Sequence, residues 1–132
     1  VGTGTGVAPY RAMLPELEKR MRATPKLKVV LVMGARFPQE LLYGAEFEAL
    51  TKSNPGFSFY ACYSLQMPDT PQPWENYGRV QTMFEKLESD SDQDMVYLCG
   101  NPDMVDESEA WFSGKGFTVG NLKKKRYKFS IF

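Results

Sequence analysis

The chain has 132 residues, which is enough for one domain with a single hydrophobic core. Sixteen basic and sixteen acidic residues cancel, so no overall field draws the protein to nucleic acid, and any bound anion must be held by local groups. The chain has no histidine, which argues against hydrolase triads and against zinc or other metal sites. It also has no apolar run near the roughly 20 residues of a membrane helix and no signal-peptide pattern, so we expect a soluble, cytoplasmic protein without a membrane span.

The chain opens on a glycine-rich turn, "VGTGTGVAPY", followed by a helical pattern over residues 9–23. Glycines let a phosphate approach the main chain, and the N–H groups that begin the next helix point at the anion. Pro9 suits the first helical position, where an N–H would have no partner. Gly6 comes one position too early for the GxGxxG fingerprint, so a tight turn without a ligand is the alternative interpretation.

Apolar runs that predict buried strands alternate along the chain with helical patterns. The strands are expected over residues 27–34, 56–64, 94–100 and 126–132. The helices are expected over residues 9–23, 39–53, 78–89 and 101–116, with Pro15 kinking or restarting the first. This alternation predicts an α/β fold of three layers (αβα), with a parallel sheet of about five strands joined by right-handed crossovers.

Two further segments and both cysteines have simple interpretations. Residues 66–76 hold three prolines and no periodicity, so we expect a loop at the carboxyl end of the strand over 56–64. The block "KKKR" at residues 123–126 is interpreted as a solvated entry to the last strand. Cys62 and Cys99 end apolar runs, where free buried cysteines commonly fall, so we expect no disulfide framework.

Three motifs carry a resemblance to a known family. "GTGTGVAP", "GARFPQELLYGAEFEAL" and "YLCGNPDMV" occur in this order, and together they resemble the pyridine-nucleotide domain of the ferredoxin–NADP reductase family over essentially the whole chain. The resemblance implies a Rossmann-like domain with a nicotinamide dinucleotide across the carboxyl ends of the strands, as is general for open α/β sheets. The implied cofactor-binding residues from the first and third motifs are Gly4, Thr5, Gly6, Pro9, Gly100, Asn101 and Pro102.

The resemblance also implies a reaction, namely hydride transfer from NADPH or NADH to FAD and onward electron transfer to a redox acceptor protein such as ferredoxin or flavodoxin. A quinone, a haem protein or an oxygenase component remains open as acceptor, because no residue distinguishes them. Cys99 matches the family cysteine beside the nicotinamide, where it would be a catalytic residue that helps to align the rings. An ordinary buried strand cysteine is the alternative for Cys99, and Cys62 is expected in the core.

The choice between NADPH and NADH depends on recognition of the 2′-phosphate, which generally requires arginine or lysine. Arg36, Ser64 and Arg79 match phosphate-binding positions of bacterial family members, and Gln81 matches a position that contacts the adenine end. Leu65 stands where a further arginine is expected, and the loop "PDTPQPWENYG" resembles that of several NADH-using relatives. The preference therefore stays open, and both arginines could instead be plain surface residues.

The sequence has no flavin-domain signature and no four-cysteine iron–sulfur pattern, so we expect the isolated chain to bind a dinucleotide without being active alone. The apolar strand that precedes the glycine turn in the family is also missing, which would leave two strands facing an unpaired slot. We therefore expect residues 1–132 to be an NAD(P)H-binding domain, a fragment that lacks its first strand and the preceding FAD-binding barrel.

Two alternatives complete the sequence-based picture. Phe132 ends the chain where some relatives stack an aromatic ring on the flavin, but "KFSIF" also alternates as a plain strand would. A non-catalytic nucleotide-binding or interaction module that retains the fold is the alternative to a reductase domain.

Overall fold

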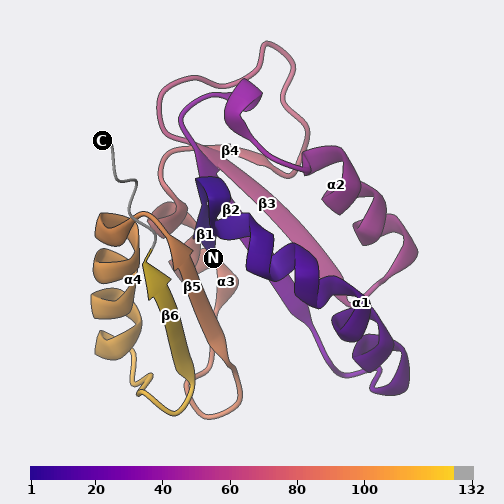
Figure 1. Cartoon of the computed structure of the whole chain (residues 1–132), viewed down its shortest axis with the longest axis vertical. Coiled ribbons are helices and arrows are strands. Elements are labelled where there is room, and N and C mark those ends of the chain that lie inside the picture. Colours follow the sequence, from indigo (N-terminus) through magenta and orange to yellow (C-terminus); the bar gives the residue numbers. More distant parts are fainter. Residues whose placement is uncertain (127–132) are drawn as a thin grey trace, which may run out of the picture.

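The computed structural model describes residues 1–126, which form one parallel sheet with helices on both faces (Figure 1). In this part of the chain the sheet has six strands in the order β4-β3-β2-β1-β5-β6, and every neighbouring pair is parallel. The strands are β1 (Gly2–Thr3), β2 (Val29–Ala35), β3 (Phe57–Tyr63), β4 (Glu75–Tyr77), β5 (Val96–Gly100) and β6 (Leu122–Arg126). The predicted α/β class and parallel sheet are confirmed, with one strand more than expected.

Two apolar clusters bury the two faces of the sheet. The longest helices, α1 (Val7–Ala23) and α4 (Pro102–Gly114), cover opposite faces, with α2 (Gly44–Ser53) beside α1 and α3 (Phe84–Leu87) beside α4. Alternate β2 residues divide between the faces, because Leu31 and Met33 join the α1 cluster and Val32 joins the α4 cluster. None of these helices within residues 1–126 is long and apolar enough to cross a bilayer.

The sequence predicts a kink or a restart at Pro15; helix α1 continues through this residue, so the restart does not occur and the kink stays a prediction. Proline in a helix interior removes one hydrogen bond and costs about 3 kcal/mol. The buried face of α1, formed by Val7, Tyr10, Leu14 and Met21, follows helical spacing. Burial of each such side chain contributes about 1.5 to 3 kcal/mol, so together they outweigh the proline.

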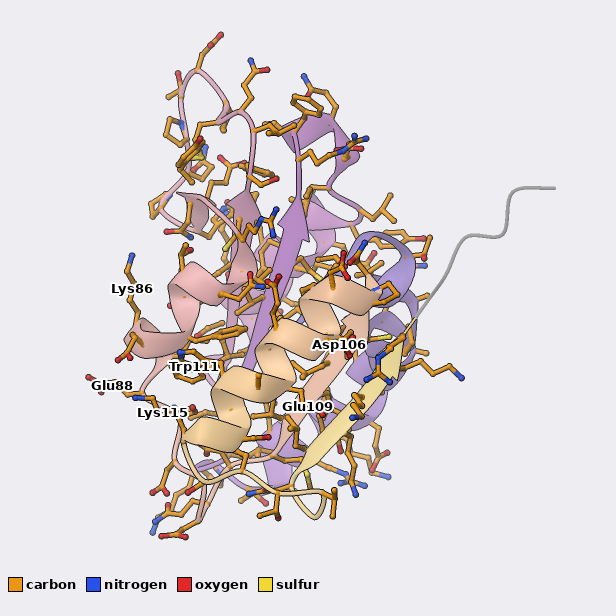
Figure 2. The ribbon with its side chains drawn as sticks, turned by 90° about the vertical axis from the view of Figure 1, so that its left-hand side faces the viewer. Lys86, Glu88, Asp106, Glu109, Trp111 and Lys115 are labelled. Carbon is orange, nitrogen blue, oxygen red and sulfur yellow. The ribbon has the colours of Figure 1, made fainter. Side chains whose placement is uncertain are left out.

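Strand β6 begins at Leu122, four residues before the predicted strand, and contains the basic block 123–126. The interpretation of that block as an entry segment is therefore wrong. An edge strand tolerates it because only Leu122 is buried, and lysines on an edge also discourage pairing with other chains. Lys124 and Arg126 pair with Glu109 and Asp106 of α4, the helix that lies beside β6 in Figure 2. Phe132 lies outside the described residues.

Three other predicted elements are shorter than expected. The predicted loop 66–76 ends in β4, because its last two residues pair with β3. The helix predicted over 39–53 is interrupted at Tyr43, whose φ of 60° lies in the left-handed region, so only a 3-10 turn (Pro38–Glu40) precedes α2. The pattern over 78–89 forms a 3-10 turn (Val80–Met83) followed by α3.

The central strand β1 has only two residues, with Gly2 opposite Met33 and Cys99, and Thr3 opposite Gly34. Val1 extends the contact with β5, since its terminal amine donates to the carbonyl of Tyr97 at 2.8 Å. Within the described part of the chain, the first four residues of β2 (residues 29–32) pair with β3 but not with β1. β1 therefore lies between β2 and β5 at their carboxyl ends, and the expectation of a longer central strand stays a prediction.

Candidate functional site

The predicted cofactor residues follow the ends of four neighbouring strands. Gly4 follows β1, Arg36 follows β2, Ser64 follows β3 and Asn101 follows β5. Because parallel strands point the same way, their carboxyl ends meet at one edge of the sheet, where open α/β sheets bind their ligands. The sheet therefore brings together residues that are up to 97 positions apart in sequence, from Gly4 to Asn101.

The two glycines of the opening turn have different surroundings. Gly4 is exposed with φ of 52°, and a β carbon there would meet no atom within 4 Å. A β carbon on the buried Gly6 would lie 2.2 Å from the carbonyl oxygen of Cys99. Gly4 thus leaves its main chain open to a ligand, whereas Gly6 lets the start of α1 approach β5. Close packing of helix on strand is the task of the third glycine in the standard fingerprint.

Helix α1 begins at Val7, so Pro9 is its third residue rather than its first. Pro9 thus lies two positions further into the helix than expected. The physical reason for tolerating proline still holds, because N–H groups throughout the first turn have no helical partner. Thr5 is exposed in the 3-10 turn (Gly4–Gly6) that leads into α1.

The start of α4 is tied to the glycine turn. The N–H of Asn101 donates to Thr3 Oγ1 at 2.9 Å, and Asn101 Oδ1 accepts from the N–H groups of Asp103 and Met104. Gly100 has φ of 141°, and a β carbon there would lie 2.3 Å from Thr3 Oγ1. Pro102 is the first residue of α4. The amino-terminal ends of α1 and α4, both partially positive, therefore follow adjacent strands and favour an anion between them.

Both cysteines are buried and neither forms a disulfide. Cys62 is in the core as expected, and burial raises the pKa of its thiol to about 11. Cys99 has 4% of its surface exposed and belongs to the apolar cluster that includes Val7, Tyr10 and Met33. The role of Cys99 beside a nicotinamide ring stays a prediction, since its thiol lies within the core of the described chain.

Main-chain hydrogen bonds hold the loops after β2, β3 and β4 together. The carbonyl of Arg36 accepts from the N–H groups of Leu65 and Gln66 at 3.0 and 3.2 Å, and the N–H of Ser64 donates to Ala35. The N–H of Gly78 donates to the carbonyl of Tyr63 at 2.8 Å, which places Arg79 beside the end of β3. The positions predicted for 2′-phosphate recognition are thus neighbours in space.

The guanidinium group of Arg36 is paired with Glu40, a residue that sequence reasoning missed. Arg36 Nη2 lies 2.7 Å from Glu40 Oε2 and Arg36 Nε lies 3.0 Å from Oε1. The hydrogen bonds from Arg36 lower the pKa of the Glu40 carboxyl and raise that of the guanidinium. The signal available in the sequence was the four-residue spacing of an arginine and a glutamate.

The other two polar candidates differ from Arg36. Arg79 is exposed and forms no ion pair with any residue that the structure describes. Gln81 Nε2 donates to Glu107 Oε2 of α4 at 2.8 Å. The buried Gln81 Oε1 has no hydrogen-bond partner among residues 1–126. The amide nitrogen of Gln81 is therefore tied to α4, while its oxygen is buried, and contact with the adenine end stays a prediction.

Two observations concern other kinds of site. A groove of about 640 Å³ between α1 and α2 is lined partly by Arg11, Tyr43 and Glu46, and it contains none of the predicted cofactor residues. No group of three or more cysteine, aspartate or glutamate side chains in the described part of the chain is arranged to hold a metal ion.

A glycine turn and two helix starts at the carboxyl edge of a parallel sheet define a dinucleotide-binding domain. The chain belongs to the family of oxidoreductase NAD-binding domains, whose family model matches residues 1–110. The resemblance to the pyridine-nucleotide domain of ferredoxin–NADP reductases is thereby confirmed.

Two curated relatives and one solved structure illustrate the family. The chain is 28% identical over 124 residues to the toluate 1,2-dioxygenase electron transfer component of Pseudomonas putida, covering 94% of this chain and 35% of that protein. It is 35% identical over 109 residues to the reductase component of propane 2-monooxygenase from Rhodococcus jostii, covering 80% of this chain and 28% of that protein. The Neisseria gonorrhoeae ferredoxin NADP+ reductase with bound FAD and NADP matches the fold with a TM-score of 0.76 at 20% identity, over 95% of this chain and 53% of that one.

Proposed function

We propose that the chain is the NAD(P)H-binding domain of a flavin-dependent reductase. In this proposal it positions the nicotinamide for hydride transfer to FAD, and electrons then pass to a redox acceptor protein such as ferredoxin, flavodoxin or an oxygenase component. The observation that carries the proposal is the pairing of Thr3 with Asn101, because it holds two helix starts beside the open main chain of Gly4. The two curated relatives support it, being named as electron transfer and reductase components.

The residues at this edge would divide the work. The N–H groups that begin α1 and α4, with the exposed Thr5 hydroxyl, would bind the pyrophosphate. Gly100 and Cys99 end β5, next to β1, and would lie beside the nicotinamide. Nicotinamide and flavin supply the redox chemistry when bound, and the protein contributes alignment of the two rings.

The proposal includes further parts of the protein. We infer that the full protein contains an FAD-binding domain and a longer central strand ahead of β1. The shortness of β1 beside β2 and the small share of each relative that this chain covers support this inference. We also infer a cytoplasmic location, because the buried thiol of Cys62 forms no disulfide, which suits a reducing compartment.

Titration of the chain with NADH and NADPH in a calorimeter tests the binding role. We expect at least one dinucleotide to bind, and we expect Gly4→Val to weaken it at least tenfold, because the added side chain occupies the space where the pyrophosphate approaches. Gly4→Ala is the matched control, since it carries the same strain at φ of 52° but adds only a β carbon that meets no atom within 4 Å, so it should weaken binding less than Gly4→Val does. A parent chain that binds neither dinucleotide at millimolar concentration contradicts the proposal.

The alternative is a non-catalytic module that binds a nucleotide without passing electrons. The two functions differ in the full-length protein, because a reductase must carry a flavin. Visible flavin absorbance that bleaches on addition of NADH or NADPH supports the reductase. Nucleotide binding by a full-length protein without any flavin supports the alternative.

A further inference from the structure

An arginine of α1 reaches across the groove between α1 and α2, the two helices that lie beside each other in Figure 1. Arg11 lies in the second turn of α1, and its Nε lies 3.2 Å from both carboxylate oxygens of Glu46 on α2. The Arg11 guanidinium also lies over the ring of Tyr43, 4.1 Å from the ring centroid. Arg11 therefore links the helix that follows the glycine turn to the beginning of α2.

The main chain of Tyr43 is held in an unfavourable conformation. Its φ of 60° and ψ of 22° lie in the left-handed region, where a residue with a side chain is strained unless the surroundings hold it there. Tyr43 is the N-cap of α2, and its carbonyl accepts from the N–H of Phe47 at 3.1 Å. The stacking of Arg11 on the Tyr43 ring is one of the contacts that can offset this strain.

Tyr43 ends the loop that joins β2 to α2. The loop is fixed at its other end, because the carbonyl of Arg36 accepts from the N–H groups of Leu65 and Gln66. In open α/β sheets the end of the second strand lies beside a ribose of the dinucleotide, and the start of the first helix lies beside the pyrophosphate. The placement of this loop relative to the start of α1 therefore affects how one ligand can contact both.

We propose that Arg11 is a positioning residue for the dinucleotide site. It holds Tyr43 in the left-handed conformation and so fixes the loop after β2 relative to the start of α1. Arg11 acts through the loop and not by contact with the ligand, because Glu46 and Tyr43 occupy its guanidinium. This inference rests on the proposed function and adds a residue away from the binding edge on which affinity depends.

The test is calorimetric titration of the whole chain with whichever of NADH and NADPH the parent binds more tightly. We expect Arg11→Met to weaken binding about fivefold, which is the size of effect that an exposed cation–π contact and an exposed ion pair have together. A binding stoichiometry equal to that of the parent shows that the variant is folded. Arg20→Met is the matched control, because it removes the same charge from an exposed ion pair with Glu16 further along α1 and should leave the affinity unchanged.

A second background separates positioning from a general effect of the substitution. Glycine adopts the left-handed conformation without help from a neighbour, so Tyr43→Gly should make Arg11 dispensable. In the Tyr43→Gly background, Arg11→Met should therefore change the affinity by less than about twofold. A merely structural role or a long-range effect of the lost charge would give the same loss in both backgrounds.

The outcomes separate this inference from the function on which it rests. An unchanged affinity in Arg11→Met, an equal loss in the two backgrounds or an equal loss in Arg20→Met overturns the positioning role and leaves the nucleotide-binding function intact. Failure of Arg11→Met to fold also overturns it, because Arg11 would then serve the fold itself. A parent chain that binds neither dinucleotide overturns both the inference and the proposed function.

Discussion

At the scale of single residues, Gly4 and Gly6 belong to one turn but have different structural roles. A β carbon at Gly4 would point into open space, while one at Gly6 would collide with the main chain of Cys99. The first glycine therefore allows the left-handed backbone of the turn and leaves its main chain open, and the second allows the packing of α1 on β5. The charge of Arg36 is visible in the sequence, but only the structure shows that it is paired with Glu40.

We predict that Gly6→Ala lowers the free energy of unfolding by about 2 kcal/mol, as overpacking of a rigid contact does. The atom in the way is a main-chain oxygen, which cannot rotate aside. Urea unfolding measures the change. Gly114→Ala is the control and should leave stability unchanged or raise it by up to about 1 kcal/mol. Equal unfolding midpoints for Gly6→Ala and the parent would contradict the packing role.

At the scale of elements, α1 holds two prolines in different situations. Pro9 lies in the first turn, where the missing N–H costs nothing, and Pro15 lies in the interior, where it removes a hydrogen bond. The helix stays continuous because the side chains of its buried face anchor it to the sheet. Tertiary packing therefore overrides a local signal to stop.

We predict opposite effects for the two prolines. Pro15→Ala should stabilise the chain by about 2 kcal/mol, because the restored hydrogen bond outweighs the entropy that the unfolded chain regains. Pro9→Ala should destabilise it by about 0.5 kcal/mol, because only the entropy term applies. Thermal and urea unfolding of both variants test this, and a loss of stability in Pro15→Ala would contradict it.

At the scale of the whole molecule, the short central strand β1 links the strands β4, β3 and β2 on one side of the sheet to β5 and β6 on the other. β1 joins β2 to β5 through two residues, and Val30 of β2 and Tyr97 of β5 carry exposed apolar side chains. Unpaired strand edges with apolar neighbours are costly and tend to recruit another strand.

We predict that an extension of four alternating valine and isoleucine residues before Val1 raises the free energy of unfolding by about 2 kcal/mol. The extension would continue β1 along the first residues of β2, and its hydrogen bonds and apolar burial would exceed the entropy of ordering it. A glycine-serine extension of equal length is the control. An equal effect of both extensions on urea unfolding would show that the slot does not accept a strand.

The sequence by itself determined the alternation of strands and helices, the glycine turn and the family, because periodicity and motif spacing depend on residues near one another in the chain. Only the tertiary structure decided how the motifs act together. Thr3 meets Asn101, and the loop of Leu65 meets Arg36, through pairing of strands distant in sequence. The pairing of Arg36 with Glu40 and the insertion of the basic block into β6 also depend on backbone geometry that local patterns do not encode. The order of strands in the sheet is the physical reason, because it decides which loops become neighbours at the binding edge.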